Sequence, residues 1–158
     1  MGGMSMTSLP TTETILKHLK LEISGRYCEL RGVRQIISDA CQWAGLTESQ
    51  CSQLEMAVDE ACTNIIEHSY GGEAAADDMH EHTIRLHMKH YRDRIVVEIY
   101  DHGSGFDYAS RTPLQLDQWL AEKQERGLGL YVITHFVDDV SYERGTRVGN
   151  YLRLTKRL

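Results

Sequence analysis

A carboxylate, an amide and an imidazole stand four residues apart in one segment of the sequence. In EMAVDEACTNIIEHSY, residues 55–70, these side chains belong to Glu60, Asn64 and His68. On an α-helix they form one ridge at the edge of an apolar stripe. A ridge in that position faces neither bulk water nor the full core, so it is suited to line the wall of a cleft with groups that bind protons or ions. The alternative is a solvated polar ridge beside a core stripe.

A second candidate site lies where a predicted strand ends. The stretch YDHGSGFD places Asp101 at the strand end and follows it with Gly103 and Gly105. A carboxylate at this place can accept a hydrogen bond from an amino group such as that of adenine. Glycine permits positive φ and close approach of the backbone to a ligand. On its own, however, the D-x-G-x-G pattern is most often a plain turn.

A third candidate site is a pair of glycines that opens a helix. ERGLGLYVI places Gly127, Leu128 and Gly129 at the start of a predicted helix. Free N–H groups and the positive end of the helix dipole favour phosphate there. The same pattern also occurs at helix starts that bind nothing. The sequence contains no Walker motif, which excludes a P-loop nucleotide site.

The order and spacing of these three motifs resemble those of the GHKL, or Bergerat-fold, ATPases over roughly residues 19–158. The resemblance implies that the protein binds ATP and Mg²⁺. It implies that Glu60 is the general base toward a substrate hydroxyl and that Asn64 ligates Mg²⁺. His68 is then expected to cap the helix end or to satisfy a hydrogen bond. The other implied ligands are Asp101, Gly103 and Gly105 for adenine and Gly127, Leu128 and Gly129 for the phosphates.

Within this superfamily, VDEACTNIIEHSY, GSGFD and RGLGLYVITHFVDDV are most similar to the anti-sigma factor serine kinases. That resemblance implies a serine/threonine kinase that phosphorylates an anti-sigma-factor antagonist of the STAS type and sequesters a sigma factor, and it is compatible with a homodimer. It also implies that Arg34 contacts protein partners, whereas a solvated helix arginine is the alternative. Two other functions stay open: a nucleotide-dependent binding switch without phosphotransfer, and a detached histidine-kinase catalytic domain.

One residue departs from the family pattern near the C-terminus. The family often has Gly-Thr before its last strand, and the threonine bonds a water beside adenine. In VGNYLRLTKRL, Asn150 stands at that place. Because asparagine both donates and accepts hydrogen bonds, we expect the adenine-side contact to persist.

Composition excludes several other functions. The net charge of −6 argues against a nucleic-acid partner. No apolar run is long enough to span a membrane, and the N-terminus lacks a secretory pattern, so a cytoplasmic protein is expected. Three of the four cysteines occupy predicted helix-core positions, as expected for reduced, buried thiols. His80, His82 and His90 are too far apart along an extended chain to share one metal ion.

The elements that position the motifs follow from the hydrophobic pattern. In TIRLHMKHY the apolar residues alternate, as on a half-buried strand, whereas residues 30–44 are apolar at helical spacing. The predicted fold is α+β: a two-layer α/β sandwich with a mainly antiparallel sheet covered on one face by helices, as in the Bergerat ATP-binding fold. A flexible lead, 1–14, precedes a single domain, 15–158, in which residues 107–126 are expected to form a lid. The predicted elements are strands at 17–25, 83–91, 94–101, 139–145 and 150–158, helices at 26–44, 47–70 and 126–137, and a short helix at 114–122.

Overall fold

The computed structural model describes residues 13–77, 80–105 and 128–158, with the backbone alone for residues 128–130. Three predicted features lie wholly or mostly outside these ranges: the flexible lead 1–14, the lid 107–126 and the short helix 114–122.

The strands of the described residues form one sheet in the order β1-β2-β3-β5-β4, with every neighbouring pair antiparallel. Apolar side chains alternate along them, so that in β2 the residues Ile84, Leu86 and Met88 are buried and their neighbours are less so. The strands are β1 (Lys17–Ser24), β2 (Thr83–His90), β3 (Arg94–Asp101), β4 (Asp139–Thr146) and β5 (Gly149–Arg157).

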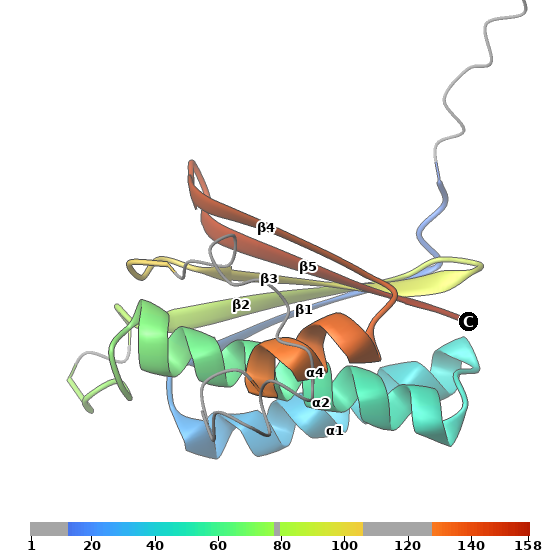
Figure 1. The fold of residues 1–158 in the computed structure, drawn as a ribbon, viewed down its shortest axis with the longest axis horizontal. Helices are drawn as coiled ribbons and strands as arrows, with labels where there is room; N and C mark the ends of the chain where they lie inside the picture. The colour runs from blue at the N-terminus through green and yellow to red at the C-terminus, as the bar shows by residue number, and fades with distance from the viewer. Residues whose placement is uncertain (1–12, 78–79, 106–127) are drawn as a thin grey trace, which may run out of the picture.

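Helices cover one face of this sheet (Figure 1). They are α1 (Leu30–Ala44), preceded by the 3₁₀ turn η1 (Tyr27–Glu29), α2 (Glu48–Asn64) and α4 (Leu128–Phe136). No helix of the described chain lies on the opposite face (Figure 1). The predicted α+β fold, a two-layer sandwich with helices on one face of an antiparallel sheet, is therefore confirmed.

Local sequence signals set the boundary between α1 and α2. Gly45 ends α1 in a left-handed conformation, with φ of 80°, which glycine adopts without strain. Thr47 and Gln50 form a capping box: the threonine side chain accepts from the N–H of Gln50, and the glutamine side chain accepts from the N–H of Thr47. Both signals are readable in the sequence, and both were predicted.

The second helix ends differently from the prediction. The sequence predicts one helix from Thr47 to about Tyr70, but the α-helix stops at Asn64. The chain continues as a π-helical turn, η2 (Ile65–Ser69), closed by a 2.9 Å hydrogen bond from the N–H of Tyr70 to the first carbonyl of the turn. Turns of this kind are rare and are frequent at functional sites.

The π turn changes which side chains face inward. Because it contains more residues than an α-helical turn, it rotates everything that follows Asn64. His68 leaves the predicted ridge and is exposed, while Ser69 is buried with 5% of its surface accessible. Neither placement is predicted by α-helical spacing.

The core fills the space between the helices and the sheet. Cys41, Cys51 and Cys62 are buried there, as predicted, and Cys28 is exposed. One charged residue, Lys156 of β5, also reaches into this layer. Its Nζ donates to Gln53 Oε1 of α2 at 2.8 Å and to the carbonyl of Phe136, the last residue of α4, at 2.9 Å. This cation satisfies a carbonyl at a helix C-terminus, where positive charge is favoured. The largest fully buried side chains are Ile37, Leu54, Ile66, Ile84, Leu86, Ile95, Ile99, Ile133 and Leu154.

The helix-free face of the sheet contains one buried carboxylate, that of Glu98. Lys89 lies 2.7 Å from it, and the hydroxyls of Tyr100 and Tyr151 each donate to it at 3.2 Å. Burial alone would raise the pKa of Glu98, but the hydrogen bond and charge of Lys89 and the two tyrosine hydrogen bonds together lower it. The ionised carboxylate therefore cross-links β2, β3 and β5.

We expect this cluster to make stability sensitive to acid. A lowered carboxyl pKa contributes stability that is fully present above the ordinary value, 4.5, and is lost as the pH falls through the folded-state value. Glu98→Gln should lower the free energy of unfolding by about 1–3 kcal/mol at pH 7, and the difference from wild type should narrow below about pH 4. Urea unfolding at both pH values measures it. Glu22→Gln, an exposed carboxylate of the same sheet face, is the control. Equal losses at the two pH values would contradict the ionised role of Glu98.

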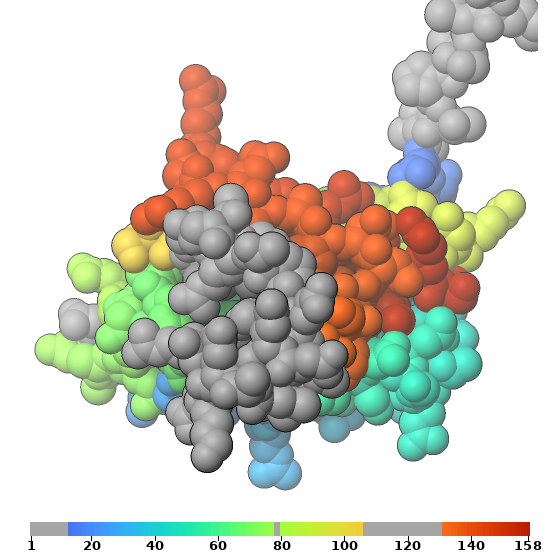
Figure 2. All heavy atoms as spheres, viewed as in Figure 1, coloured from blue at the N-terminus to red at the C-terminus, as the bar shows by residue number. Residues whose placement is uncertain are grey.

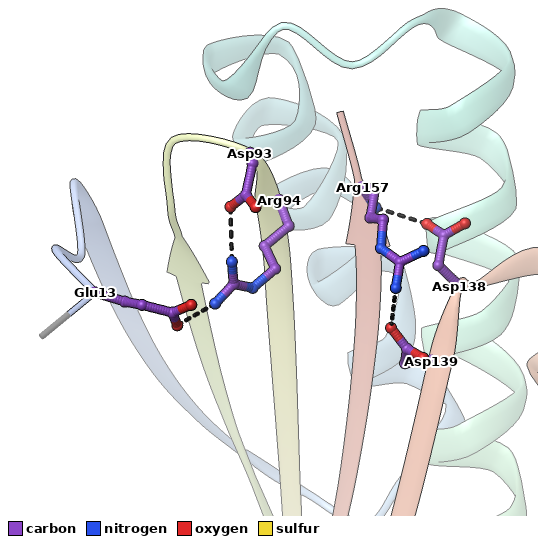
Figure 3. A network of polar contacts seen from close by, with 6 residues as sticks. All are labelled: Glu13, Asp93, Arg94, Asp138, Asp139 and Arg157. Atoms are coloured by element: carbon purple, nitrogen blue, oxygen red, sulfur yellow. Dashed lines mark hydrogen bonds and ion pairs between the residues drawn. The ribbon is translucent and has the colours of Figure 1, made fainter. Parts of the chain in front are cut away.

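A network of charged side chains joins the strands at the end of the sheet remote from Asp101 (Figure 3). Arg94 of β3 pairs with Asp93 at 2.7 Å and with Glu13, and Arg157 of β5 pairs with Asp139 at 2.9 Å. The N–H of Arg157 also donates to Asp138 at 2.6 Å. Exposed pairs of this kind contribute little to stability. They mark the end of the sheet at which no predicted site residue lies.

Candidate functional site

A small hollow opens between α2, η2, α4 and the part of the sheet formed by β3, β5 and β4. Its walls are mainly apolar, and the side chains with polar groups are those of Asn64, Ser69, Asp101 and Tyr142. It holds about 20 Å³, which is room for one water molecule. A larger ligand would therefore require side chains at its mouth to move. The lining residues are Ala61, Asn64, Ile65, Ser69, Asp101, Ile133, Tyr142 and Leu152.

Asp101 is the most enclosed polar residue of the hollow, with 3% of its surface accessible. Its Oδ1 accepts from the N–H of Gly103 at 2.9 Å, from Nδ2 of Asn150 at 2.9 Å and from the hydroxyl of Ser69. The predicted adenine ligand is thus a fixed, buried acceptor at the end of β3.

Neighbouring atoms that the sequence alone did not identify explain why glycine occupies the two positions after Asp101. A Cβ on Gly103 would collide with the hydroxyl and carbonyl oxygens of Ser69. Gly105 has φ of 78°, and a Cβ there would lie 2.8–2.9 Å from atoms of Arg144 and Asn150. The predicted close approach to a ligand stays a prediction, whereas the close approach of this loop to Ser69 is observed.

Asn150 lies directly opposite Asp101 in the pairing of β3 with β5. Besides bonding Asp101, its Nδ2 donates to the carbonyl of Gly103 at 3.1 Å, and its Oδ1 accepts from the N–H of Gly145 at 3.0 Å. Asn150 therefore lies beside Asp101, the predicted adenine ligand, and a contact of Asn150 on the adenine side stays a prediction. However, the asparagine contacts the carboxylate itself and so differs from a residue that acts through water.

Glu60 and Asn64 lie one turn apart near the end of α2. Asn64 lines the hollow, whereas Glu60 does not and lies partly buried beside it. Burial raises the pKa of Glu60, and the negative charges of Asp59 and Glu67 raise it further. A general base is more effective when its pKa is closer to the operating pH, so this environment suits the predicted function.

The third member of the predicted ridge lies elsewhere. Nε2 of His68 is 3.9 Å from a carboxylate oxygen of Glu67, on the exposed side of η2, and does not line the hollow. The structure therefore brings Asn64 into contact with the same space as Asp101 and leaves His68 out of it.

The glycine pair before α4 is only partly described. Gly127 lies outside the described residues, and α4 begins at Leu128, so Gly129 belongs to its first turn. The pair was predicted to open a helix, and the helix does begin there. A contact between a phosphate and the N–H groups at the start of α4 stays a prediction.

Arg34 of α1 lies on a different surface from the hollow. Its Nη1 is 2.5 Å from Oδ1 of Asp59, and both side chains are partly exposed, at 47% and 30%. The prediction of a partner contact is untested, but the arginine is paired with α2 next to Glu60. The sequence did not indicate this link between the two helices.

Sequence reasoning missed Ser69 and Tyr70. The hydroxyl of Tyr70 donates to the carbonyl of Thr83 at 2.5 Å and accepts from the N–H of His102 at 3.0 Å. Ser69 bonds both Asp101 and the loop after it. Both residues follow directly after the polar ridge in EHSY, but their inward direction depends on the π turn.

No group of three or more His, Cys, Asp or Glu residues within the described ranges could hold a metal ion. A Mg²⁺ ion would therefore depend on the amide oxygen of Asn64 together with ligand phosphates and water, a donor set that suits Mg²⁺. The described helices include none that is long and apolar enough to cross a membrane.

Comparison with protein families matches residues 23–156 to the histidine kinase-like ATPase domain. Among curated relatives, the chain is similar to the serine-protein kinase RsbW of Halalkalibacterium halodurans, with 30% identity over 132 residues, which cover 80% of this chain and 74% of that protein. It is also 28% identical over 126 residues to the serine-protein kinase RsbW of Bacillus cereus strain G9842, covering 77% of this chain and 73% of that protein.

Solved structures share the fold at lower identity. The RsbU and RsbW domains of Rv1364c from Mycobacterium tuberculosis match with a TM-score of 0.62 and 18% identity over 90% of this chain and 32% of that one. The SiaB–SiaC complex from Pseudomonas aeruginosa matches with a TM-score of 0.60 and 15% identity over 92% and 90% of the two chains. At these identities the likeness concerns the fold.

Proposed function

Because the chain belongs to the histidine kinase-like ATPase family, in the branch of anti-sigma factor serine kinases, we propose that it binds Mg²⁺-ATP at the hollow beside Asp101. We propose further that it transfers the γ-phosphoryl group to a serine or threonine of an anti-sigma-factor antagonist and sequesters a sigma factor. One observation carries the proposal: Asn64 and Asp101, from separate motifs, line one hollow, and Glu60 lies one turn from Asn64.

The residues divide the chemistry as follows. Asp101 accepts a hydrogen bond from the amino group of adenine, and Gly103, Gly105 and Asn150 support that carboxylate. Glu60 accepts the proton of the attacking hydroxyl. Asn64 would hold Mg²⁺, which would supply neutralising charge beside the phosphates, and phosphoryl transfer depends mainly on such positioning and neutralisation. The N–H groups at Gly127, Leu128 and Gly129 are the proposed phosphate contacts.

The proposed partners are proteins. The antagonist is expected to be a STAS-type domain, and the chain is proposed to act in the cytoplasm as a single domain over residues 15–158, compatible with a homodimer. The solved SiaB–SiaC complex shows that a protein of this fold associates with another protein. Neither a nucleic-acid nor a membrane partner is proposed, and the net charge of −6 argues against the former.

One labelling experiment tests the kinase function. The protein is incubated with γ-labelled ATP and candidate antagonist proteins from the same genome, and the label is tested for acid and alkali stability. Label on serine or threonine of an antagonist supports the proposal. Acid-labile label on histidine would indicate a detached histidine-kinase catalytic domain instead. Nucleotide binding without any label would indicate a binding switch without phosphotransfer.

Arg34→Ala should separate partner binding from nucleotide binding. Removing an exposed guanidinium that contacts a partner should weaken binding to the labelled antagonist or the sigma factor by about 10-fold or more. ATP affinity should stay unchanged, because Arg34 does not line the hollow. The free energy of unfolding should fall by no more than about 1 kcal/mol, since the Asp59 pair is partly exposed.

The matched control for this variant is Arg31→Ala, an exposed arginine of the same helix. Surface-binding kinetics and ATP calorimetry measure the two affinities separately. If Arg34→Ala binds the partner as tightly as Arg31→Ala, the partner surface lies elsewhere.

A further inference from the structure

In the described part of the loop after Asp101, residues 102–105, each backbone N–H already donates within the protein and none is left to bind a ligand. The N–H of His102 donates to the hydroxyl of Tyr70 at 3.0 Å, and that of Gly103 donates to Asp101 at 2.9 Å. The next two N–H groups donate to Ser69, one to its carbonyl at 2.8 Å and one to its hydroxyl at 3.0 Å. This loop is therefore not a phosphate cradle. It is a preorganised side of the site, attached to the end of η2 by hydrogen bonds to Ser69 and Tyr70.

The two oxygens of the Asp101 carboxylate differ in their surroundings. Oδ1 receives three donors, from Ser69, Gly103 and Asn150. No residue of the described chain donates a hydrogen bond to Oδ2. Because Asp101 lines the hollow, Oδ2 is the oxygen left for a ligand. Three donors on one oxygen also fix the plane of the carboxylate.

Ser69 links these two features. A hydroxyl has one hydrogen to donate, and that of Ser69 goes to Asp101. Its oxygen in turn accepts from the N–H of Gly105 at 3.0 Å. Ser69 is 5% accessible, so bulk water does not replace either contact. A single buried side chain thus sets both the carboxylate and the loop.

We infer that Ser69, with Asn150, is a positioning residue that fixes the orientation of the Asp101 carboxylate with Oδ2 facing the base, so that the site takes a 6-amino purine and rejects a 6-oxo purine. The inference rests on the proposed nucleotide site and names how that site selects its base. A 6-amino group donates to Oδ2. The O6 atom of a 6-oxo purine is an acceptor, and it would face the carboxylate without a hydrogen between them. A buried unmatched acceptor of this kind is costly.

The test compares ATP with inosine triphosphate, a 6-oxo purine nucleotide, by calorimetry at pH 7. Wild type should prefer ATP. Ser69→Ala should lower ATP affinity about 10- to 100-fold, the cost of one hydrogen bond to a charged group. It should also reduce the ratio of ATP affinity to inosine triphosphate affinity at least about 5-fold, because the carboxylate has lost one of the donors that fix its orientation and can rotate away from the base. Asn150→Ala removes a second donor to the same oxygen from another strand, and it should shift the ratio in the same direction.

Two further variants separate positioning from simple support of the loop. Ser69→Thr keeps the hydroxyl and should restore the ratio. Ser104→Ala removes a hydroxyl that bonds the carbonyl of Ser69 at 3.1 Å without touching the carboxylate, so its ratio should match wild type. Thermal unfolding verifies that each variant is folded.

The possible outcomes separate the inference from the proposed function. If wild type binds neither nucleotide, the proposed function fails and the inference fails with it. A second outcome is that wild type prefers ATP but Ser69→Ala and Asn150→Ala lower the affinities for ATP and for inosine triphosphate by the same factor. The two residues then only support the fold, and the inference alone is wrong. Unchanged affinities in both variants would also overturn it.

Discussion

Replacing Glu60 with glutamine is expected to slow phosphoryl transfer to the antagonist by about 10²–10⁴-fold, the usual contribution of a positioned general base. The amide keeps the size and polarity of the side chain but cannot accept the hydroxyl proton. ATP affinity should stay within a few-fold of wild type, because Glu60 does not line the hollow. Single-turnover transfer, measured beside nucleotide calorimetry, separates these two effects.

The pH dependence of the same reaction gives an independent check. Burial, Asp59 and Glu67 raise the pKa of Glu60 above its ordinary value of 4.5. Only the ionised carboxylate accepts a proton, so the wild-type transfer rate should rise as the pH increases through this raised pKa and then level off. The residual rate of Glu60→Gln should lack that rise.

Glu55→Gln, the same change on the same helix away from the polar ridge, is the control and should transfer at the wild-type rate. Sequestering a partner needs a surface and no proton transfer, so Glu60→Gln should still bind the sigma factor and act as a permanent inhibitor in cells. Transfer at the unmodified rate by Glu60→Gln would refute the general-base assignment.

Most of the fold could be predicted because its signals are local. The alternation of apolar residues in β2, the capping box at Thr47 and the left-handed Gly45 each depend on a few neighbouring residues. The antiparallel sheet then follows from short connections and from helices on one face. The structure pairs Asp101 with Asn150 across β3 and β5, whereas the predicted contact of Asn150 on the adenine side stays a prediction.

The part of the site that could not be predicted depends on contacts between distant residues. Ser69 forms hydrogen bonds with Asp101 and Gly105, which lie more than 30 positions after it in the sequence. Its inward direction comes from the π turn, and α-helical spacing cannot indicate a turn with an extra residue. For the same reason the predicted ridge was wrong at His68 and correct at Asn64, which precedes the turn.

The surroundings of the two glycines show the same limit. D-x-G-x-G indicates where a loop needs glycine, but not which atoms press against it. At Gly103 those atoms belong to Ser69, and at Gly105 they belong to Arg144 and Asn150. The pattern therefore indicates a glycine loop, as predicted. The atoms that exclude a Cβ at Gly103 and Gly105 belong to other parts of the protein.

Asp101→Asn is expected to reverse the base preference of the site. The three donors that meet Oδ1 should keep the oxygen of the new amide on that side, because an amide nitrogen there would face Ser69, Gly103 and Asn150 donor to donor. The amide nitrogen is then forced to the place of Oδ2, toward the base. It opposes the amino group of adenine and donates to O6 of a 6-oxo purine.

ATP affinity of Asp101→Asn should therefore fall by about 1–3 kcal/mol, the cost of a lost hydrogen bond to a charged group together with an unmatched donor. Affinity for inosine triphosphate should rise or stay constant, which simple damage to the loop does not produce. Calorimetry with both nucleotides measures the change. Asp139→Asn, at the remote end of the sheet beside Arg157 (Figure 3), is the control and should bind both as wild type does. Tight ATP binding by Asp101→Asn would place the adenine contact on another residue.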